Sequence, residues 1–121
     1  MNTFVVAFCS ILISAAAQFS LKAGMSADAV KTAMQQPFSI KTLLVILTDK
    51  FVLGGFLLYG FGAVVWLWVL SKWEVSKAYP MVGIGFLVTA VVGAMIGEHI
   101  SLSRGAGIVM ICIGIWFISN S

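Results

Sequence analysis

The sequence predicts an all-α fold, an integral membrane bundle of four transmembrane helices that forms a single domain over residues 1–121. Of the 121 residues, 61% are hydrophobic and only 9% are charged, whereas a soluble domain keeps about a quarter of its residues charged. So few charges cannot cover a core with a wetted surface. Four apolar runs approach or reach the length that crosses about 30 Å of hydrocarbon. Helices are expected because isolated strands leave backbone groups unpaired in lipid.

The first span is expected at about residues 3–22, from Thr3 to Leu21 with Lys22 at its end. Its sequence ISAAAQ is similar to a signal-peptidase site. However, the opening residues MNTF lack the positive charges that precede a secretory signal, and the rest of the chain is also membranous. We therefore expect this helix to be retained.

The connection at about residues 26–49 is predicted to be a short interfacial helical segment. Ser26 is placed to cap a short helix, ADAVKTAMQQ, which Pro37 would end. The following stretch, FSIKTLLVILTDK, is too short and too polar at its ends to cross the membrane. We expect it to lie in the membrane interface, with an ordinary loop as the alternative.

Three further spans are expected at about residues 51–71, 78–97 and 101–119, the last of them somewhat short. An even number of crossings places both termini on one side. Lysine and arginine are enriched on the cytoplasmic side of membrane proteins. We expect the protein in the cytoplasmic (inner) membrane. The side that carries more cations is expected to face the cytoplasm, which favours both termini outside. One side carries Lys22, Lys31, Lys41, Lys50 and Arg104, and the other carries Lys72 and Lys77.

Glycines within the spans indicate close helix contacts. Gly93 and Gly97 form the sequence GAMIG, a small-xxx-small pattern that lets helix backbones approach. Gly107 and Gly114 are seven residues apart, hence on nearly one face of the last helix. We interpret these four as helix-packing or dimer positions. Gly83 and Gly85 are expected to loosen the third span near its start.

A polar stripe runs along the first span. Ser10, Ser14, Gln18 and Lys22 follow one another at steps of four, which places them on one helix face. Polar groups facing lipid are costly, so the stripe is expected to face the bundle interior or a cavity. Serines commonly serve helix packing, and Lys22 is equally explained by snorkelling at the helix end. Gln18, with both donors and an acceptor, favours the cavity.

Residues for catalysis or metal binding are not apparent in the sequence. The single histidine, His99, stands beside Glu98 at a helix end, where a structural role is more common than metal ligation. Cys9 and Cys112 lie within spans and suit small apolar fillers. We expect no enzymatic activity, no cofactor, no metal and no nucleic-acid partner.

The C-terminal two thirds of the chain resembles the drug/metabolite transporter superfamily. The resemblance rests on SKAYP at residues 76–80, an apolar helix ending in Gly-Glu, the turn ISLSRGAG and a final helix with two glycines seven apart. The final stretch GIVMICIGIWFISNS is similar to the last helix of small multidrug resistance proteins. The stretch from Tyr59 to Gly85 is closer to small EamA-like members, among them aminoarabinose-phosphoundecaprenol flippase subunits with a similar AYPM segment. The first span is covered more loosely, through AQFSLK.

The resemblance implies roles for particular residues. Tyr79 matches the tyrosine of the drug exporters' third-helix site, Pro80 and Glu98 belong to the shared motif, and the Gly107–Gly114 pair matches a dimer contact. Small multidrug exporters exchange protons at a first-helix glutamate, whose position here is held by Ser14. Because serine cannot carry that proton, the resemblance implies no proton-coupled drug export of that kind.

The function favoured by these observations is a flippase, or a flippase subunit, for an undecaprenyl-phosphate-linked sugar or a similar lipid. Lysine serves as a point-charge phosphate ligand, so we place a head-group site at five polar residues: Gln18, Lys22, Tyr79, Lys77 and Ser14. The end of the first span and the start of the third lie on opposite sides, so these residues form two stations.

Four helices enclose little volume, so a homodimer or a heterodimer with a similar small membrane protein is expected. Two alternatives remain, an amphiphile or small-solute exporter of the same superfamily and a non-transporting subunit of a membrane complex.

Overall fold

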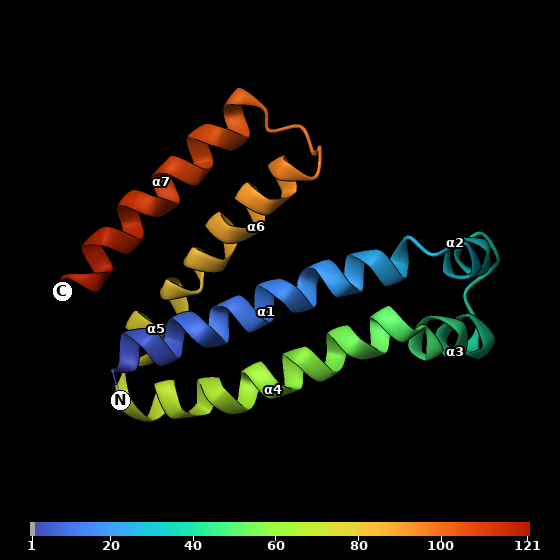
Figure 1. Ribbon diagram of the computed structural model, residues 1–121, viewed down its shortest axis with the longest axis horizontal. Coiled ribbons are helices and arrows are strands. Elements are labelled where there is room, and N and C mark those ends of the chain that lie inside the picture. Colours follow the sequence, from blue (N-terminus) through green and yellow to red (C-terminus); the bar gives the residue numbers. More distant parts are fainter. Residues whose placement is uncertain (1) are drawn as a thin grey trace.

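A computed structural model describes residues 2–121 and consists, in that range, of seven helices (Figure 1). Four stretches are long and apolar enough to cross a membrane, which confirms the predicted fold class. The third of these stretches, Val75–Met95, comprises two consecutive helices. The elements are α1 (Thr3–Met25), α2 (Asp28–Met34), α3 (Ile40–Thr48), α4 (Lys50–Lys72), α5 (Val75–Met81), α6 (Gly83–Met95) and α7 (Leu102–Ser119).

The two termini lie at the same end of the molecule (Figure 1). From this end α1 runs to the α2–α3 segment, α4 returns, α5 and α6 run out again, and α7 returns beside α6. This order is the arrangement that four successive membrane crossings require.

Helices α1 and α4 make the most extensive contact in the fold. Their backbones approach closely because glycines on each helix leave room for residues of the other. A Cβ at Gly55 would lie 2.7 Å from Cγ of Leu21, and a Cβ at Gly24 would lie 2.8 Å from the backbone nitrogen of Val52. Such contacts supply the packing that holds helices together where lipid offers little hydrophobic drive. The pairing of α1 with α4 therefore rests on glycines.

The third span is broken after Pro80. It begins at Val75 rather than at residue 78, so Pro80 is the sixth residue of α5 and not part of a first turn. Lys77 and Tyr79, expected at the start of the third span, lie inside α5, where the N–H of Lys77 already bonds to the carbonyl of Glu74 at 3.0 Å. A proline inside a helix removes a hydrogen bond and clashes with the preceding turn. The chain leaves regular helix at Val82, two residues after Pro80 and directly before Gly83, and resumes as α6.

Glycines on the far side of this break pack against neighbouring helices. The expected loosening near Gly83 is observed, and a Cβ there would lie 2.9 Å from Cδ1 of Ile115 on α7. A Cβ at Gly85 would lie 3.1 Å from Cγ2 of Ile11 on α1. The contact at Gly83 packs α6 against α7, and the contact at Gly85 packs α6 against α1.

Helix α6 ends at Met95, earlier than the expected residue 97. Gly97 has φ +100°, a left-handed conformation that glycine adopts readily. The N–H of Glu98 donates to the carbonyl of Gly93 at 2.9 Å, and that of Gly97 donates to Ala94 at 3.2 Å. This pattern is a Schellman motif. Gly97 thus lies beyond the helix and does not share a helix face with Gly93.

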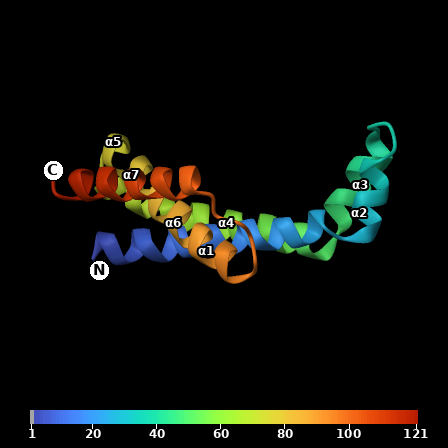
Figure 2. The same ribbon diagram turned by 90° about the horizontal axis from the view of Figure 1, so that it is seen from above.

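Residues 26–49 form two short helices rather than a loop. Ser26 was expected to cap the start of α2, but it caps the end of α1 instead. Its N–H and its hydroxyl both donate to the carbonyl of Lys22. The N-cap of α2 is Ala27, without a side-chain hydrogen bond. Helices α2 and α3 are seen nearly end-on in Figure 1, and Figure 2 shows them turned away from the axis of α1 and α4.

Candidate functional site

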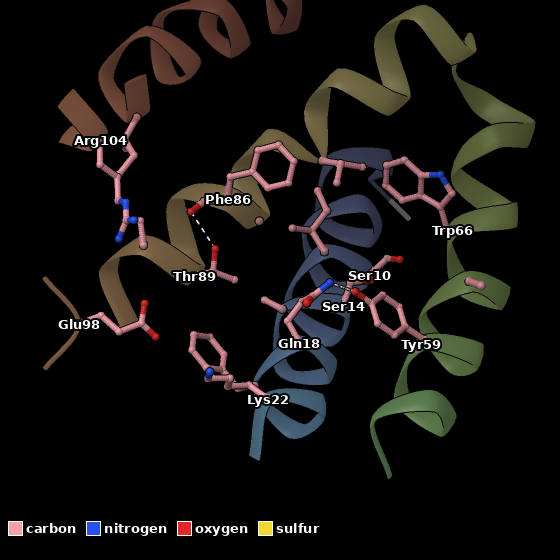
Figure 3. Close-up of a pocket in the computed structure, with 18 of the residues that line it drawn as sticks. Ser10, Ser14, Gln18, Lys22, Tyr59, Trp66, Phe86, Thr89, Glu98 and Arg104 are labelled. Carbon is pink, nitrogen blue, oxygen red and sulfur yellow. Dashed lines mark hydrogen bonds between the residues drawn. The ribbon is translucent and has the colours of Figure 1, made fainter. Parts of the chain in front are cut away.

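A cavity of about 800 Å³ lies between α1, α4, α6 and α7. Apolar side chains, among them Ile11, Trp66 and Phe86, form much of its wall. Gln18 and Lys22 come from the second half of α1, and Glu98 and Arg104 come from the loop after α6 and the start of α7 (Figure 3). These segments lie at the ends of α1, α6 and α7 that are away from the termini (Figure 1). The cavity therefore combines an apolar wall with a charged end.

The polar stripe of α1 lies along this cavity. Ser10, Ser14, Gln18 and Lys22 all line it, but they differ in what they contact. Ser10 is buried and donates to the carbonyl of Gly62 at 2.8 Å, so its hydroxyl is occupied in packing. Ser14 is half-buried, whereas Gln18 and Lys22 are exposed. The part of the stripe available to a ligand is therefore its second half.

Tyr59 on α4 also belongs to the site, although the sequence reading did not select it. The side-chain amide of Gln18 donates to the Tyr59 hydroxyl (Figure 3). A phenol in an apolar span needs a partner for its hydroxyl, and that need was the available sequence signal. The contact orients Gln18 toward α4 at the edge of the cavity.

The opposite wall carries Glu98 and Arg104. Arg104 donates from Nη1 to the carbonyl of His99 at 3.0 Å, and its backbone N–H is capped by Ser101 at 3.1 Å. The carboxylate of Glu98 lies against Gly93, where Oε1 would be 2.9 Å from an added Cβ. In Figure 3, Glu98 and Lys22 lie on opposite sides of one space. The charged end of the cavity is thus formed by two cations, Lys22 and Arg104, and one carboxylate, Glu98.

Lys77 and Tyr79 lie elsewhere. The ammonium of Lys77 is 4.9 Å from the ring centroid of Trp73 and 5.5 Å from that of Phe4. Tyr79 is 71% exposed, and neither residue lines the cavity. The structure therefore brings Ser14, Gln18 and Lys22 together, but not with Lys77 and Tyr79.

Gly107 and Gly114 lie on the surface of α7. A Cβ at either position would meet no other atom within 4 Å, and the described residues of α7 include none that is buried. Pro80 lies in α5, outside the cavity. Within residues 2–121 there is no group of three or more His, Cys, Asp or Glu side chains that could hold a metal ion.

One curated relative aligns with nearly the whole chain, and others align with about half of it. The "Probable 4-amino-4-deoxy-L-arabinose-phosphoundecaprenol flippase subunit ArnF" of Proteus mirabilis is 32% identical over 118 residues, 94% of this chain and 89% of the relative. The probable ArnE subunit of Sodalis glossinidius is 42% identical over 60 residues, 49% of this chain and 54% of the relative. The probable ArnF subunit of Photorhabdus laumondii is 29% identical over 72 residues, 57% of each chain. No family model and no solved structure matches.

The full-length alignment agrees with the four apolar spans. It confirms the resemblance inferred from the SKAYP segment and the predicted class, a small multi-pass membrane protein of the transporter kind. The relatives of this chain are named as flippase subunits, which are transport components rather than enzymes. The chain belongs to the family of 4-amino-4-deoxy-L-arabinose-phosphoundecaprenol flippase subunits.

Proposed function

We propose that this protein is one subunit of an inner-membrane flippase for an undecaprenyl-phosphate-linked sugar, of the kind named for its relatives. The observation that carries the proposal is the cavity with a charged end and apolar walls between α1 and the α6–α7 pair. A lipid-linked sugar needs such a combination, because its phosphate and sugar are polar while the chain attached to them is not.

The charged end supplies suitable groups for the head. Lys22 and Arg104 offer positive charge to the phosphate, Lys22 as a point charge and Arg104 through a planar fork of donors. Gln18, with Tyr59, offers donors and acceptors to sugar hydroxyls. The cavity's volume of about 800 Å³ falls in the range of small-ligand sites. It suits a sugar phosphate and the first part of the lipid, while the remaining tail stays among the bilayer chains.

A second subunit completes the pathway in this proposal. The cavity lies toward one end of the fold, whereas Tyr79 and Lys77 lie at the other and would form the second station. Helix α7 presents Gly107 and Gly114 without a neighbour, which suits close approach by another copy or a similar small protein. Replacing either glycine by leucine should weaken that assembly.

The orientation follows from charge. Five of the seven lysines and arginines lie toward the α2–α3 end, which supports a cytoplasmic position for that end and an outside position for both termini. The cavity's charged end then receives the head group on the cytoplasmic side, and Tyr79 and Lys77 lie on the release side.

Reconstitution tests this function. The protein, alone and together with a related small subunit, is placed in liposomes with labelled undecaprenyl-phosphate sugars or with cationic amphiphiles. We expect saturable binding and transfer of the lipid-linked sugar. Transfer of the cationic amphiphiles alone would indicate the exporter alternative and contradict the proposal.

A further inference from the structure

We propose that Glu98 distinguishes aminated from uncharged sugar head groups by pairing its carboxylate with the ammonium of the sugar. This inference rests on the proposed function, and it assigns a specific recognition role to a residue on the wall opposite Lys22.

The end of α6 is built to turn Glu98 back along its own helix. Gly97, at φ +100°, reverses the chain, and the N–H of Glu98 bonds to the carbonyl of Gly93. The Glu98 side chain then occupies the space that a side chain at residue 93 would fill, since an added Cβ would lie 2.9 Å from Oε1 and 3.2 Å from Cδ. Gly93 and Gly97 are thus positioning residues for the carboxylate.

The charges at this end match a zwitterion better than an anion. Among the described residues that line the cavity, Glu98 carries the only carboxylate, with Lys22 and Arg104 as the cations. A carboxylate beside a phosphate site is unfavourable for a purely anionic head group, because like charges repel. It becomes favourable when the ligand also carries a positive charge within reach. An amino sugar joined to a phosphate supplies one charge of each sign.

The test compares two lipids in nanodiscs at fixed salt: undecaprenyl-phosphate aminopentose and the same lipid with its amine acetylated. Wild-type protein should bind the aminated lipid roughly tenfold more tightly, as expected for a hydrogen bond to a charged group. Glu98→Gln should remove the preference while binding to the acetylated lipid persists. Glu74→Gln, which changes a carboxylate at the other end of the bundle, should leave the preference intact.

Gly93→Ala provides a second variant. The atom that a new Cβ would meet is the far end of a flexible side chain, so Glu98 should move while the helices stay packed. The preference for the aminated lipid should fall in this variant, whereas Gly60→Ala, where a Cβ meets nothing within 4 Å, should retain it. Equal wild-type affinity for the two lipids would overturn the role of Glu98 and leave the proposed function intact. Absence of binding to either lipid would overturn the proposed function itself.

Independently of any substrate, we infer that the α2–α3 segment lies on the membrane surface with α3 against lipid. Four apolar residues of α3 recur at helical spacing and are all exposed: Ile40 at 78%, Leu43 at 42%, Leu44 at 56% and Leu47 at 37%. On the other side of the segment, side chains are buried between α2 and α3: Val30 is 1% exposed and Thr42 is 4% exposed. An apolar stripe of this kind is typical of an interfacial helix.

Two neighbouring features select lipid as the occupant. Helix α3 joins the membrane-spanning α4 through Asp49 alone, so it cannot lie far from the bilayer surface. The segment is turned across the axis of α1 and α4 (Figures 1 and 2), which places it along the membrane plane. Lys31 and Lys41 then lie at a height where lipid phosphates are available.

Spin labels in a background without Cys9 and Cys112 test this placement in liposomes. A label at Leu44→Cys should be relaxed by oxygen more than by a water-soluble nickel chelate, as at Leu57→Cys on the lipid-facing surface of α4. A label at Asp28→Cys should show the reverse. Preference for the nickel chelate at Leu44 would overturn the inference, and so would shielding from both reagents, which would indicate a protein partner.

Discussion

The hydroxyl of Ser10 donates a hydrogen bond of 2.8 Å to the carbonyl oxygen of Gly62, across the buried contact between α1 and α4. Ser10 is 2% exposed, so its polar group is consumed by helix packing. Ser10→Ala should lower the free energy of unfolding by about 1 kcal/mol or less, the usual size of a hydrogen bond between membrane helices. Unfolding in mixed micelles measures this. Loss of substrate binding with unchanged stability would contradict the packing role.

Gly24→Ala should destabilise the protein, whereas Gly60→Ala should not. A Cβ at residue 24 would lie 2.5 Å from Cγ2 of Val52 and 2.8 Å from its backbone nitrogen, so α1 and α4 must separate. At residue 60 nothing lies within 4 Å, and alanine favours a helix over glycine by about 1 kcal/mol. Thermal unfolding in detergent compares the two. Equal midpoints would show that the α1–α4 contact is looser than described.

Lys22→Ala should weaken binding of an undecaprenyl-phosphate-linked sugar more than Lys72→Ala. Lys22 lines the cavity, whereas Lys72 lies at the other end of the fold, with its ammonium 5.4 Å from the Trp68 ring centroid. Loss of a charged hydrogen bond to phosphate corresponds to a roughly tenfold or greater change in affinity. Substrate-induced thermal shift at fixed salt gives the comparison. Similar effects of both changes would leave only nonspecific attraction between cations and anionic lipid.

Single cysteines at Thr3, Ser76 and Ser119 should react with an impermeant reagent from the same side of the membrane. Two of the four candidate spans separate the first position from the second, and the other two separate the second from the third. A cysteine at Ser39, between α2 and α3, should react from the opposite side. Labelling of Ser76 from the side opposite to the two ends would exclude four crossings.

The apolar runs predicted the long helices well, because mean apolarity over about 20 residues decides whether a segment can cross a bilayer. Boundaries depended on local chemistry that the runs do not report. Helix α1 continues past Lys22 to Met25, where Ser26 bonds back to the Lys22 carbonyl. Helix α6 stops early because Gly97 adopts a left-handed conformation.

The candidate site could be predicted only on the wall formed by α1. A step of four residues places Gln18 and Lys22 on one face, and this holds whatever the helix packs against. The opposite wall depends on how α6 and α7 are folded onto α1, which no spacing within one helix encodes. The place of Arg104 in the site therefore emerged only from the structure, and so did the contact of the Glu98 carboxylate with Gly93, which depends on the turn at Gly97.

Photo-crosslinking of the lipid head group tests the central proposal most directly. An undecaprenyl-phosphate aminopentose with a photoreactive group beside its phosphate is bound to wild-type protein in nanodiscs, and the labelled peptides are sequenced. We expect adducts within residues 18–22 and 98–104, which excess unlabelled lipid removes and which Lys22→Ala reduces. Adducts confined to the outer surface of α4 around Leu57, or adducts that excess lipid does not remove, would contradict it.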